Sequence, residues 1–343
     1  MRTRQNDIFL PPYKVEHTLG TLSQSQGWHI RQLNVPKTWE YTRGCDITVM
    51  VLDTGCSDHT DLIANVDVLK RRSFLSHEPD LIDHNGHQTH VMGIIGAEDN
   101  AFGVVGVAPN CRMISCKVLD TQGSGDFRAI KQALRYAKQV RPHVINMSLG
   151  SHVHDPEVHY LIRELYEMNI PIVAAAGNDG RHDVVNYPAK YPETIAVSAY
   201  DQYGRPARFN STGPQVEFAA PGVQIYSTWL NNTYARLDGT SMATPVITGI
   251  IALLLAKHHK QELETGENDC RTVEQIRHHL IKYTQSDGTI AKDDVWGYGI
   301  VDVKQAIKNS ISDSPISMTY DIVRPAKPNI FRRILNSIRR RLT

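Results

Sequence analysis

Short apolar runs alternate with segments of helical periodicity through the middle of this 343-residue chain. The runs cover residues 47–53, 113–120, 143–150, 170–178 and 194–200. Residues 127–140 and 157–169 repeat apolar side chains at helical spacing, and residues 243–259 are apolar on every side. Parallel strands need long crossover connections and a cover on both faces. The alternation therefore predicts an α/β fold, with a mostly parallel central sheet and helices on both faces.

Composition divides the chain into three parts. Residues 1–22 form an N-terminal extension, residues 23–309 carry the alternating pattern without a repeat or linker, and residues 310–343 form a basic tail. With 41% hydrophobic and 21% charged residues, the chain has the composition of a globular protein with a sizeable core. The net charge of +1 hides an asymmetry: residues 327–343 hold six basic residues and no acid, which leaves −5 for residues 1–326.

The apolar residues of the tail fall roughly on one helical stripe beside its arginines. A basic amphipathic helix suits an anionic membrane surface, a nucleic acid, or docking on its own body or on a second copy of the chain. Docking or a homodimer contact is the preferred interpretation.

The cysteines indicate a reducing environment. They are odd in number and follow no disulfide framework spacing, which favours free thiols; they are Cys45, Cys56, Cys111, Cys116 and Cys270. The first fifteen residues lack the pattern of a secretory signal, and the apolar run 249–256 is too short to span a bilayer. We therefore expect a cytoplasmic protein.

Two polar residues stand where a fold of this class places its sites, although each has an ordinary explanation. Asp53 ends an apolar run, at the sheet edge where open α/β proteins bind ligands, but many such aspartates only cap a turn. Ser241 begins the all-apolar helix. A serine there is most often an N-cap, yet the helix dipole would also favour an oxyanion at this position.

Three histidines, His84, His87 and His90, recur at every third residue ahead of a small apolar run. Such spacing could hold a metal, but the segment lacks the glutamate of the H-E-x-x-H zinc signature. One packed and two surface histidines are the simpler interpretation of the segment alone.

Together, Asp53, His87 and Ser241 supply the three roles of an activated nucleophile, in that order along the chain. The segments VLDTG, HNGHQTHVMG and GTSMATP around them resemble the three signatures of the subtilisin-like serine proteases. AAAGNDG, FAAPGVQIYST and GYGIVDVKQA resemble further blocks of that family in the same order. The resemblance covers roughly residues 23–308 and implies the three-layer subtilisin-like fold and serine endopeptidase activity on proteins or peptides.

The resemblance also implies a role for each site residue. Ser241 would attack the peptide carbonyl, His87 would take its proton and pass it to the leaving amine, and Asp53 would hold the imidazole in the right tautomer. Asn178 would donate its side-chain amide to the oxyanion, beside the backbone N–H of Ser241.

Two glycine-containing stretches resemble the family's substrate channel. Gly123, Ser124 and Gly125 on one side, and Ser148, Leu149 and Gly150 on the other, would hold an extended peptide by strand addition. Asn186 would lie near the base of the main specificity pocket, where its bulk argues against a preference for large aromatic side chains.

A calcium site is a further expectation from the resemblance. The loop GAEDNAFGVVGVAP resembles the family's calcium loop. The expected oxygen ligands suit Ca²⁺ and come from Gln24, Asp61, Asn100 and the carbonyls of Glu98, Phe102 and Val104.

The chain departs from the family where Gln88 and Met92 replace glycine and alanine beside the predicted base. We expect the triad to survive this extra bulk. Two rival functions remain open at this point: an inactive peptide-binding protein that keeps the fold, and a histidine-ligated metallohydrolase.

The N-terminal extension contains an apolar, proline-rich strip, residues 9–15, with the core Leu10, Pro11, Pro12 and Tyr13. Proline favours extended backbone, and intracellular subtilisins look similar in carrying a short Leu-x-Pro-Tyr motif in an extension of comparable length. The strip is therefore expected to cover the active site and inhibit it until cleavage within residues 17–24. The alternative is a terminus that is merely packed on the surface.

Overall fold

The computed structural model describes residues 7–18, 23–266, 270–285 and 292–309. Its strands are β1 (Asp7–Phe9), β2 (Lys14–Thr18), β3 (Thr48–Asp53), β4 (Arg72–Ser73), β5 (Arg112–Lys117), β6 (Ser124–Asp126), β7 (Val144–Met147), β8 (Ile172–Ala175), β9 (Thr194–Tyr200), β10 (Val216–Pro221), β11 (Ile225–Trp229), β12 (Thr233–Asp238), β13 (Thr284–Gln285) and β14 (Ile300–Val301).

The helices are α1 (Trp28–Gln32), α2 (His87–Gly96), α3 (Phe127–Val140), α4 (Pro156–Glu167), α5 (Thr240–Thr265), α6 (Val273–Lys282) and α7 (Val303–Lys308). Short 3₁₀ segments lie at Val35–Thr38, Ile63–Asn65 and Leu230–Asn232. The five expected strands are present as β3, β5, β7, β8 and β9, and the three expected helices as α3, α4 and α5.

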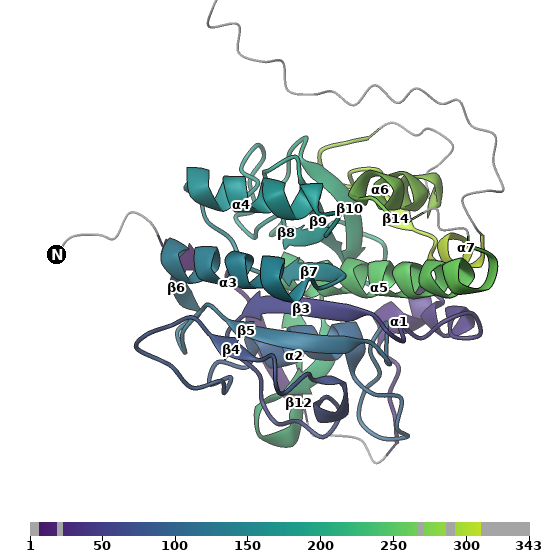
Figure 1. The fold of residues 1–343 in the computed structure, drawn as a ribbon, viewed down its shortest axis with the longest axis horizontal. Helices are drawn as coiled ribbons and strands as arrows, with labels where there is room; N and C mark the ends of the chain where they lie inside the picture. The colour runs from purple at the N-terminus through teal and green to yellow at the C-terminus, as the bar shows by residue number, and fades with distance from the viewer. Residues whose placement is uncertain (1–6, 19–22, 267–269, 286–291, 310–343) are drawn as a thin grey trace, which may run out of the picture. The chain divides into compact units, whose positions relative to one another are not determined.

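The main sheet has seven strands in the order β10-β9-β8-β7-β3-β5-β4, and every neighbouring pair in it is parallel (Figure 1). The carboxyl ends of all seven strands therefore open on one edge. This confirms the predicted α/β fold with a mostly parallel sheet.

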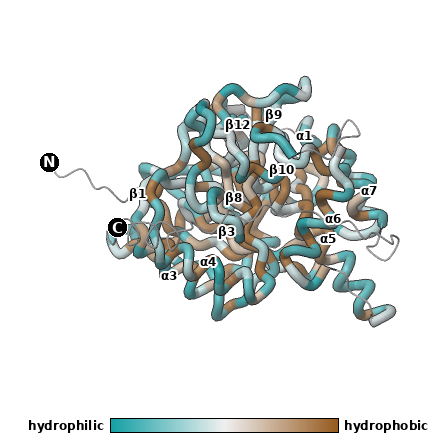
Figure 2. The backbone as a smooth tube through the Cα atoms, turned by 90° about the horizontal axis from the view of Figure 1, so that it is seen from above, coloured by the Kyte–Doolittle hydropathy of each residue, from teal (hydrophilic) through white to brown (hydrophobic). Residues whose placement is uncertain are grey.

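The sheet separates two hydrophobic cores, and the pleat of β3 shows the division. Val49 and Val51 face one core together with α2 and α5, whereas Met50 and Leu52 face the other core together with α3 and α4. Successive side chains of a strand point to opposite faces, so a strand covered on both sides reads as an unbroken apolar run. In Figure 2 the hydrophobic colour gathers in the interior around β3 and β8.

Helix α5 is apolar enough and long enough to cross a membrane by composition and length alone. However, 89% of its apolar window is buried inside the protein, because the helix packs on the sheet and on α2. Its hydrophobic character is that of a core helix, as expected from a segment that is apolar all round.

The N-terminal extension joins the fold through two strands. β1 pairs antiparallel with β6, and β2 adds an antiparallel edge strand to β12, which itself pairs with β11. The described residues all belong to one compact unit, Met1–Ile311. The predicted boundary at residues 22–23 adjoins residues 19–22, and the basic tail is residues 310–343; both stretches lie outside the described residues.

All five cysteines lie in the described part of the chain, and none of them is in a disulfide. Cys45 is exposed and the other four are buried. The free thiols expected from the cysteine spacing are therefore present.

Two buried histidines make the stability of this fold depend on pH. Burial lowers the pKa of His29 and of His90 from 6.5 to about 3. An unfolded chain accepts protons on these rings below pH 6.5, whereas the folded chain does not. The stabilisation is therefore complete above about pH 6.5 and is lost as the pH falls from there toward 3.

We predict that acidification from pH 7.5 to 5 lowers the free energy of unfolding by about 2 kcal/mol for each buried histidine. Urea unfolding at both pH values measures the change. His29→Gln should lose about 2 kcal/mol less than the parent protein over this interval. His77→Gln, which alters an exposed ring, should follow the parent protein. An unchanged pH dependence in His29→Gln would contradict the prediction.

Candidate active site

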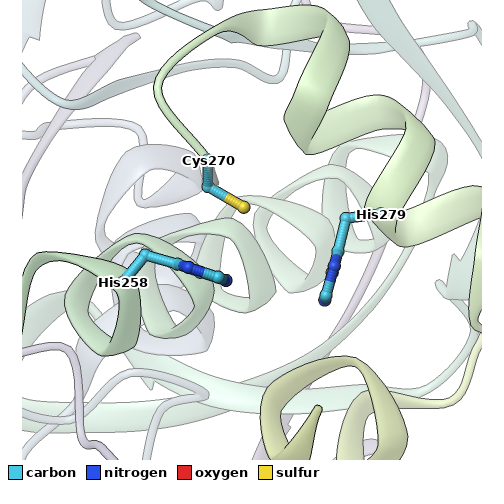
Figure 3. Close-up of side chains that lie close together, drawn as sticks. All are labelled: His258, Cys270 and His279. Carbon is cyan, nitrogen blue, oxygen red and sulfur yellow. The ribbon is translucent and has the colours of Figure 1, made fainter. Parts of the chain in front are cut away.

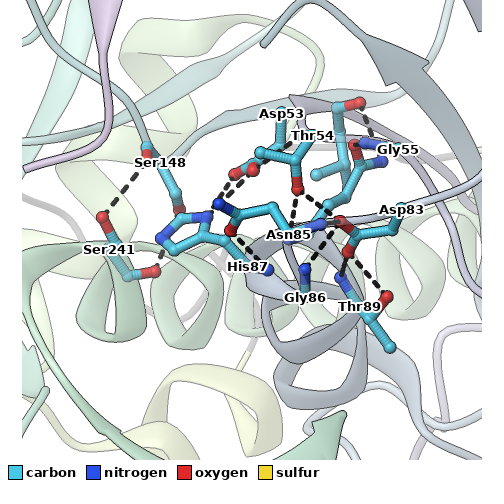
Figure 4. Close-up of polar contacts among 12 residues, drawn as sticks. Asp53, Thr54, Gly55, Asp83, Asn85, Gly86, His87, Thr89, Ser148 and Ser241 are labelled. Atoms are coloured by element: carbon cyan, nitrogen blue, oxygen red, sulfur yellow. Dashed lines mark hydrogen bonds and ion pairs between the residues drawn. The ribbon is translucent and has the colours of Figure 1, made fainter. Parts of the chain in front are cut away.

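Asp53 and His87 form a buried pair at the carboxyl edge of the sheet. Asp53 is the last residue of β3 and His87 is the first residue of α2, and both are fully buried. The Nδ1 atom of His87 lies 2.9 Å from both carboxylate oxygens of Asp53 (Figure 4). Burial raises the pKa of Asp53, and the facing His87 opposes this rise. A carboxylate in this position can hold the ring in the tautomer that leaves Nε2 as a base.

Asp83 fixes the start of the helix that carries His87. One of its oxygens accepts from the Thr54 hydroxyl and from the amides of Asn85 and Gly86. The other accepts from the amide and the hydroxyl of Thr89. The carboxylate thus satisfies N–H groups that the first turn of α2 leaves without a helical partner. The sequence analysis missed this residue, because it stands three residues before the N-cap Gly86 and so outside the position where a capping aspartate is expected.

Ser241 occupies the first turn of α5, with its side chain fully buried. Its hydroxyl donates to the carbonyl of Ser148 at 3.1 Å, and the Ser148 hydroxyl donates to the carbonyl of Ser241 at 3.0 Å. Pro245 explains the second bond, because it has no N–H to offer the carbonyl four residues earlier. Figure 4 shows the ring of His87 between Ser241 and Asp53.

The Nε2 atom of His87 has no hydrogen-bond partner among the described residues. The Ser241 hydroxyl is directed at Ser148 instead. Ser241 and His87 therefore lie in the same site, but the hydrogen bond that would activate the Ser241 hydroxyl is not formed.

Asn178 follows β8 and directs its side-chain amide into the same site. Its Oδ1 atom accepts from the amide and the hydroxyl of Thr240, at 3.0 and 2.8 Å, and this fixes the orientation of the group. Its Nδ2 atom donates to the carbonyl of Pro12 at 2.9 Å. The amide is therefore placed to bind a carbonyl oxygen beside the start of α5.

Gln88 lies on the buried side of α2, away from the open end of the site. Its Oε1 atom accepts from the amide of Gly55 at 2.7 Å, and its Nε2 atom donates to the Ser115 hydroxyl at 2.8 Å. It also contacts the sulfur of Met92, which is equally buried. The side chain of Gln88 thus links α2 to β3 and to β5.

The three regularly spaced histidines do not form a metal site. His84 is half exposed and lies 3.2 Å from Asp80, whereas His90 contacts the carbonyls of Ile225 and Ala235 at 3.0 and 3.1 Å. None of the groups of potential metal ligands in the described residues includes His84, His87 or His90. A metallohydrolase ligated by His84, His87 and His90 therefore has no structural basis within the described residues.

The N-terminal extension runs between the two predicted channel strands. β1 pairs with residues 124–126, and the amide of Leu10 donates to Gly123 at 2.9 Å. On the other side, Phe9 and Gly150 exchange both backbone hydrogen bonds, at 3.0 and 2.9 Å. The extension is thus the middle strand of a three-stranded arrangement across the site. Leu149 is buried in the core beside it.

Tyr13, which follows the residues held between the two channel strands, lies over the candidate catalytic residue His87. Its ring lies 5.1 Å from the ring of His87, and its hydroxyl donates to Asn85 at 2.8 Å. Burial and the charge of Asp53 raise the pKa of Tyr13 to about 12, so the phenol keeps its proton. The strip from Leu10 to Tyr13 therefore lies directly over Asn178 and His87.

Asn186 is buried beside Gly150 and Gly177. Neither atom of its side-chain amide has a hydrogen-bond partner within the described residues. A buried amide without partners is costly, so this group is suited to meet a polar atom brought by a ligand.

The residues expected to bind calcium lie in one hydrogen-bonded network. The carboxylate of Asp61 is fully buried and accepts from the Asn100 side chain, the Val104 amide and the Tyr234 hydroxyl. The Gln24 side chain donates to the carbonyl of Glu98 at 3.0 Å, and the amide of Phe102 donates to Asn100. The donor set is rich in oxygen, as Ca²⁺ requires, once the amides of Gln24 and Asn100 turn their oxygens inward.

Comparison with known families identifies the fold. A family model described as the subtilase family matches residues 44–299, which is more than half of the chain. The chain belongs to the subtilase family. Asp53, His87, Asn178 and Ser241 all lie inside the matched region.

Several curated subtilases are similar over most of this chain. The minor extracellular protease Epr of Bacillus subtilis is 35% identical over 291 residues, 84% of this chain and 43% of its own length. The thermostable alkaline protease of Halalkalibacterium halodurans is 42% identical over 241 residues, 69% of this chain and 65% of its own. Subtilisin Savinase of Lederbergia lenta is 37% identical over 287 residues, 83% of this chain and all of its own. The chain thus spans less than two thirds of the first two relatives and the whole of the third.

Proposed function

We propose that this subtilase is a serine endopeptidase that works through Asp53, His87 and Ser241. The observation that carries the proposal is the fully buried pair of Asp53 and His87, 2.9 Å apart, with Ser241 at the start of α5 across the ring. Epr and the alkaline protease of Halalkalibacterium halodurans, which are 35% and 42% identical to this chain, are named proteases.

In the proposed reaction, His87 Nε2 takes the proton of the Ser241 hydroxyl as the oxygen attacks the peptide carbonyl. Asp53 stabilises the imidazolium that forms. Asn178 donates its Nδ2 hydrogen to the developing oxyanion, together with the backbone N–H of Ser241. His87 then passes the proton to the leaving amine, and water hydrolyses the acyl-enzyme with the same groups.

We also propose that the N-terminal extension inhibits the enzyme, as in intracellular subtilisins. It occupies the strand position of a substrate, between Gly123 and Gly150, and it puts a carbonyl on Asn178. A tethered ribbon of this kind has an effective concentration of roughly millimolar, so modest affinity is enough for inhibition. Cleavage within residues 17–24 would release it.

The two prolines account for resistance of the ribbon to cleavage. An antiparallel pair repeats its double hydrogen bonds at every second residue, so the bonded pair Phe9–Gly150 brings Pro11 opposite Ser148. Pro11 has no N–H to donate to the carbonyl of Ser148. That carbonyl accepts a hydrogen bond from the Ser241 hydroxyl instead. The inhibitory strip thereby leaves the nucleophile bound to Ser148 and away from its base.

The Asn178 amide binds the carbonyl of Pro12, one residue beyond Pro11. The N-terminal strip is thus bound in the manner expected of a substrate. It is not attacked, because the Ser241 hydroxyl donates to Ser148 instead. Tyr13 adds a cover over His87.

A structural Ca²⁺ ion is proposed at the network around Asp61. Asp61, Asn100, Gln24 and the carbonyls of Glu98, Phe102 and Val104 would supply its oxygen ligands. The ion would hold residues 24–25 against the loop at 98–104, where Gln24 and Ser25 donate their amides to Ala101 and Gly103.

The five free thiols favour a cytoplasmic enzyme, and we propose this location, although the relative Epr is named an extracellular protease. Protein or peptide chains are the proposed substrates. The basic tail, residues 310–343, lies outside the described residues. Its contact with a second copy of the chain, a membrane surface or a nucleic acid stays a prediction.

A serine-directed fluorophosphonate tests the catalytic assignment. In a chain that begins at Ser23, it should label one site, and Ser241→Ala should abolish the label and lower the hydrolysis rate of a chromogenic peptide by at least about 10⁴-fold. Asn178→Leu should lower kcat by about 10² to 10³-fold. Ser76→Ala, at a surface serine bonded to Arg128, is the control and should be unchanged. A label that survives Ser241→Ala would exclude the assignment, and an unlabelled parent would indicate an inactive binding protein.

Initial rates test the inhibitory role of the extension. The full-length chain should hydrolyse the peptide at least about tenfold more slowly than a chain that begins at Ser23. Pro11→Ala/Pro12→Ala should restore the N–H groups, allow cleavage of the strip and give a rate that rises with time, with the released fragment visible by mass spectrometry. Lys14→Ala, at an exposed position of β2, should stay inhibited. Equal rates for the full-length and shortened chains would refute the inhibition.

Thermal unfolding of Ser241→Ala, which cannot digest itself, tests the calcium proposal. Excess Ca²⁺ over chelator should raise the midpoint by about 5 °C. Asp61→Asn should remove most of this rise, whereas Asp58→Asn, at an exposed carboxylate, should keep it. A midpoint that does not respond to Ca²⁺ in the parent protein would contradict the proposal.

A further inference from the structure

Three buried side chains with metal-binding atoms meet at the far end of α5 from the active site. They are His258 of α5, Cys270 of the connection that follows it, and His279 of α6. One nitrogen of each histidine and the cysteine sulfur all lie within 4.8 Å of one another. Figure 3 shows the three side chains directed toward a common centre. Cys270 is 3% exposed, and the two histidines are at most 2% exposed.

The local sequence explains why these residues meet. Gly266 ends α5 in the left-handed region, and Thr272 with Gln275 forms a capping box that starts α6. These caps fix where α5 ends and where α6 begins. Cys270 falls in this short connection, and His279 returns on α6 toward the buried face of α5.

A backbone carbonyl sets the tautomer of His279. Its Nε2 atom lies 2.6 Å from the carbonyl oxygen of Ala306, which can only accept a hydrogen bond. The proton of the neutral ring is therefore on Nε2, and Nδ1 carries the lone pair. Histidines that bind metals are commonly oriented by such a bond from the second ring nitrogen to a carbonyl.

The donor set selects the metal. One thiolate and two imidazoles suit Zn²⁺, which binds sulfur at about 2.3 Å and nitrogen at about 2.0 Å in tetrahedral sites. Hard ions such as Ca²⁺ and Mg²⁺ prefer oxygen ligands. Tetrahedral Zn²⁺ needs ligand atoms about 3.5 Å apart, so binding would draw the three atoms together by at most about 1.3 Å, within reach of small side-chain rotations.

A surface pocket borders the cluster at Cys270. A surface pocket of about 380 Å³ is lined by Leu255, His259, Cys270 and Arg271, among others. Cys270 is thus shared between the buried cluster and the wall of this pocket. Water from this side can provide the fourth ligand.

We propose that His258, Cys270 and His279 bind one Zn²⁺ ion, which ties α6 and the preceding connection to the end of α5. His258 is 17 residues beyond Ser241, about 25 Å along the helix, so this site is separate from the proposed catalytic one. Two other groups of potential ligands, at His77, Glu78 and Asp120 and at His182, Asp183 and Asp294, are less buried and contain no thiolate.

Cobalt titration of the full-length Ser241→Ala protein tests the proposal, because thiolate-bound Co²⁺ absorbs in the near ultraviolet and reports sulfur ligation directly. We expect one Co²⁺ per chain with this band, displacement by equimolar Zn²⁺, and no displacement by excess Ca²⁺. Cys270→Ser should abolish the band, and His279→Gln should weaken binding by about 100-fold or more. Cys111→Ser, at a buried thiol elsewhere in the fold, should retain both the band and the affinity.

Alkylation gives a second measurement that needs no variant. Zn²⁺ should slow the modification of Cys270, followed by mass spectrometry under partially opening conditions, and should leave that of the exposed Cys45 unchanged. Absence of the cobalt band in the parent protein, its persistence in Cys270→Ser, or equal alkylation of Cys270 with and without Zn²⁺ would overturn the proposal. None of these outcomes bears on the catalytic assignment, which rests on Ser241 labelling.

Discussion

The shared direction of the main-sheet strands is the constraint on which the site depends. Because every neighbouring pair is parallel, the carboxyl ends of β3, β7 and β8 meet at one edge. β3 delivers Asp53 there, β7 leads into Ser148, and β8 leads into Asn178. The helices that cover one face then bring His87 and Ser241 to the same edge at their first turns. No single element holds the site, and it exists only when the whole sheet is assembled.

Much of this arrangement could be predicted because burial on both faces leaves a clear mark in the sequence. The five apolar runs match strands, but three of them were predicted too long at their carboxyl ends. Residues 118–120, 148–150 and 176–178 continue the apolar or small-residue pattern after the ladder has ended. Val118, Leu119, Leu149 and Ala176 belong to the hydrophobic core although they lie beyond the strand pairing, so hydrophobicity alone cannot locate the end of the strand.

The features that were missed depend on contacts between distant segments. Asp83 accepts hydrogen bonds from the Thr54 hydroxyl after β3 and from the Thr89 amide in α2. Gln88 joins three elements with one side chain. The cluster of His258, Cys270 and His279 has no motif spacing, because a helix–connection–helix reversal brings its members together. The Asn178 amide donates to the carbonyl of Pro12 and not to a neighbouring one because of the register of the N-terminal strip. Composition does not determine that register.

Pro245 has an effect that reaches beyond its own helix. By withholding an N–H from the carbonyl of Ser241, it opens the first turn of α5 to a bond from Ser148. Ser148 lies opposite Pro11 in the strand arrangement, and its hydroxyl also accepts from Asn146 at 2.9 Å. Two reciprocal hydrogen bonds therefore couple the strand segment at Ser148 to the first turn of α5 at Ser241. Under the proposed mechanism, a displacement of the segment that would align a substrate would also move the hydroxyl that would attack it.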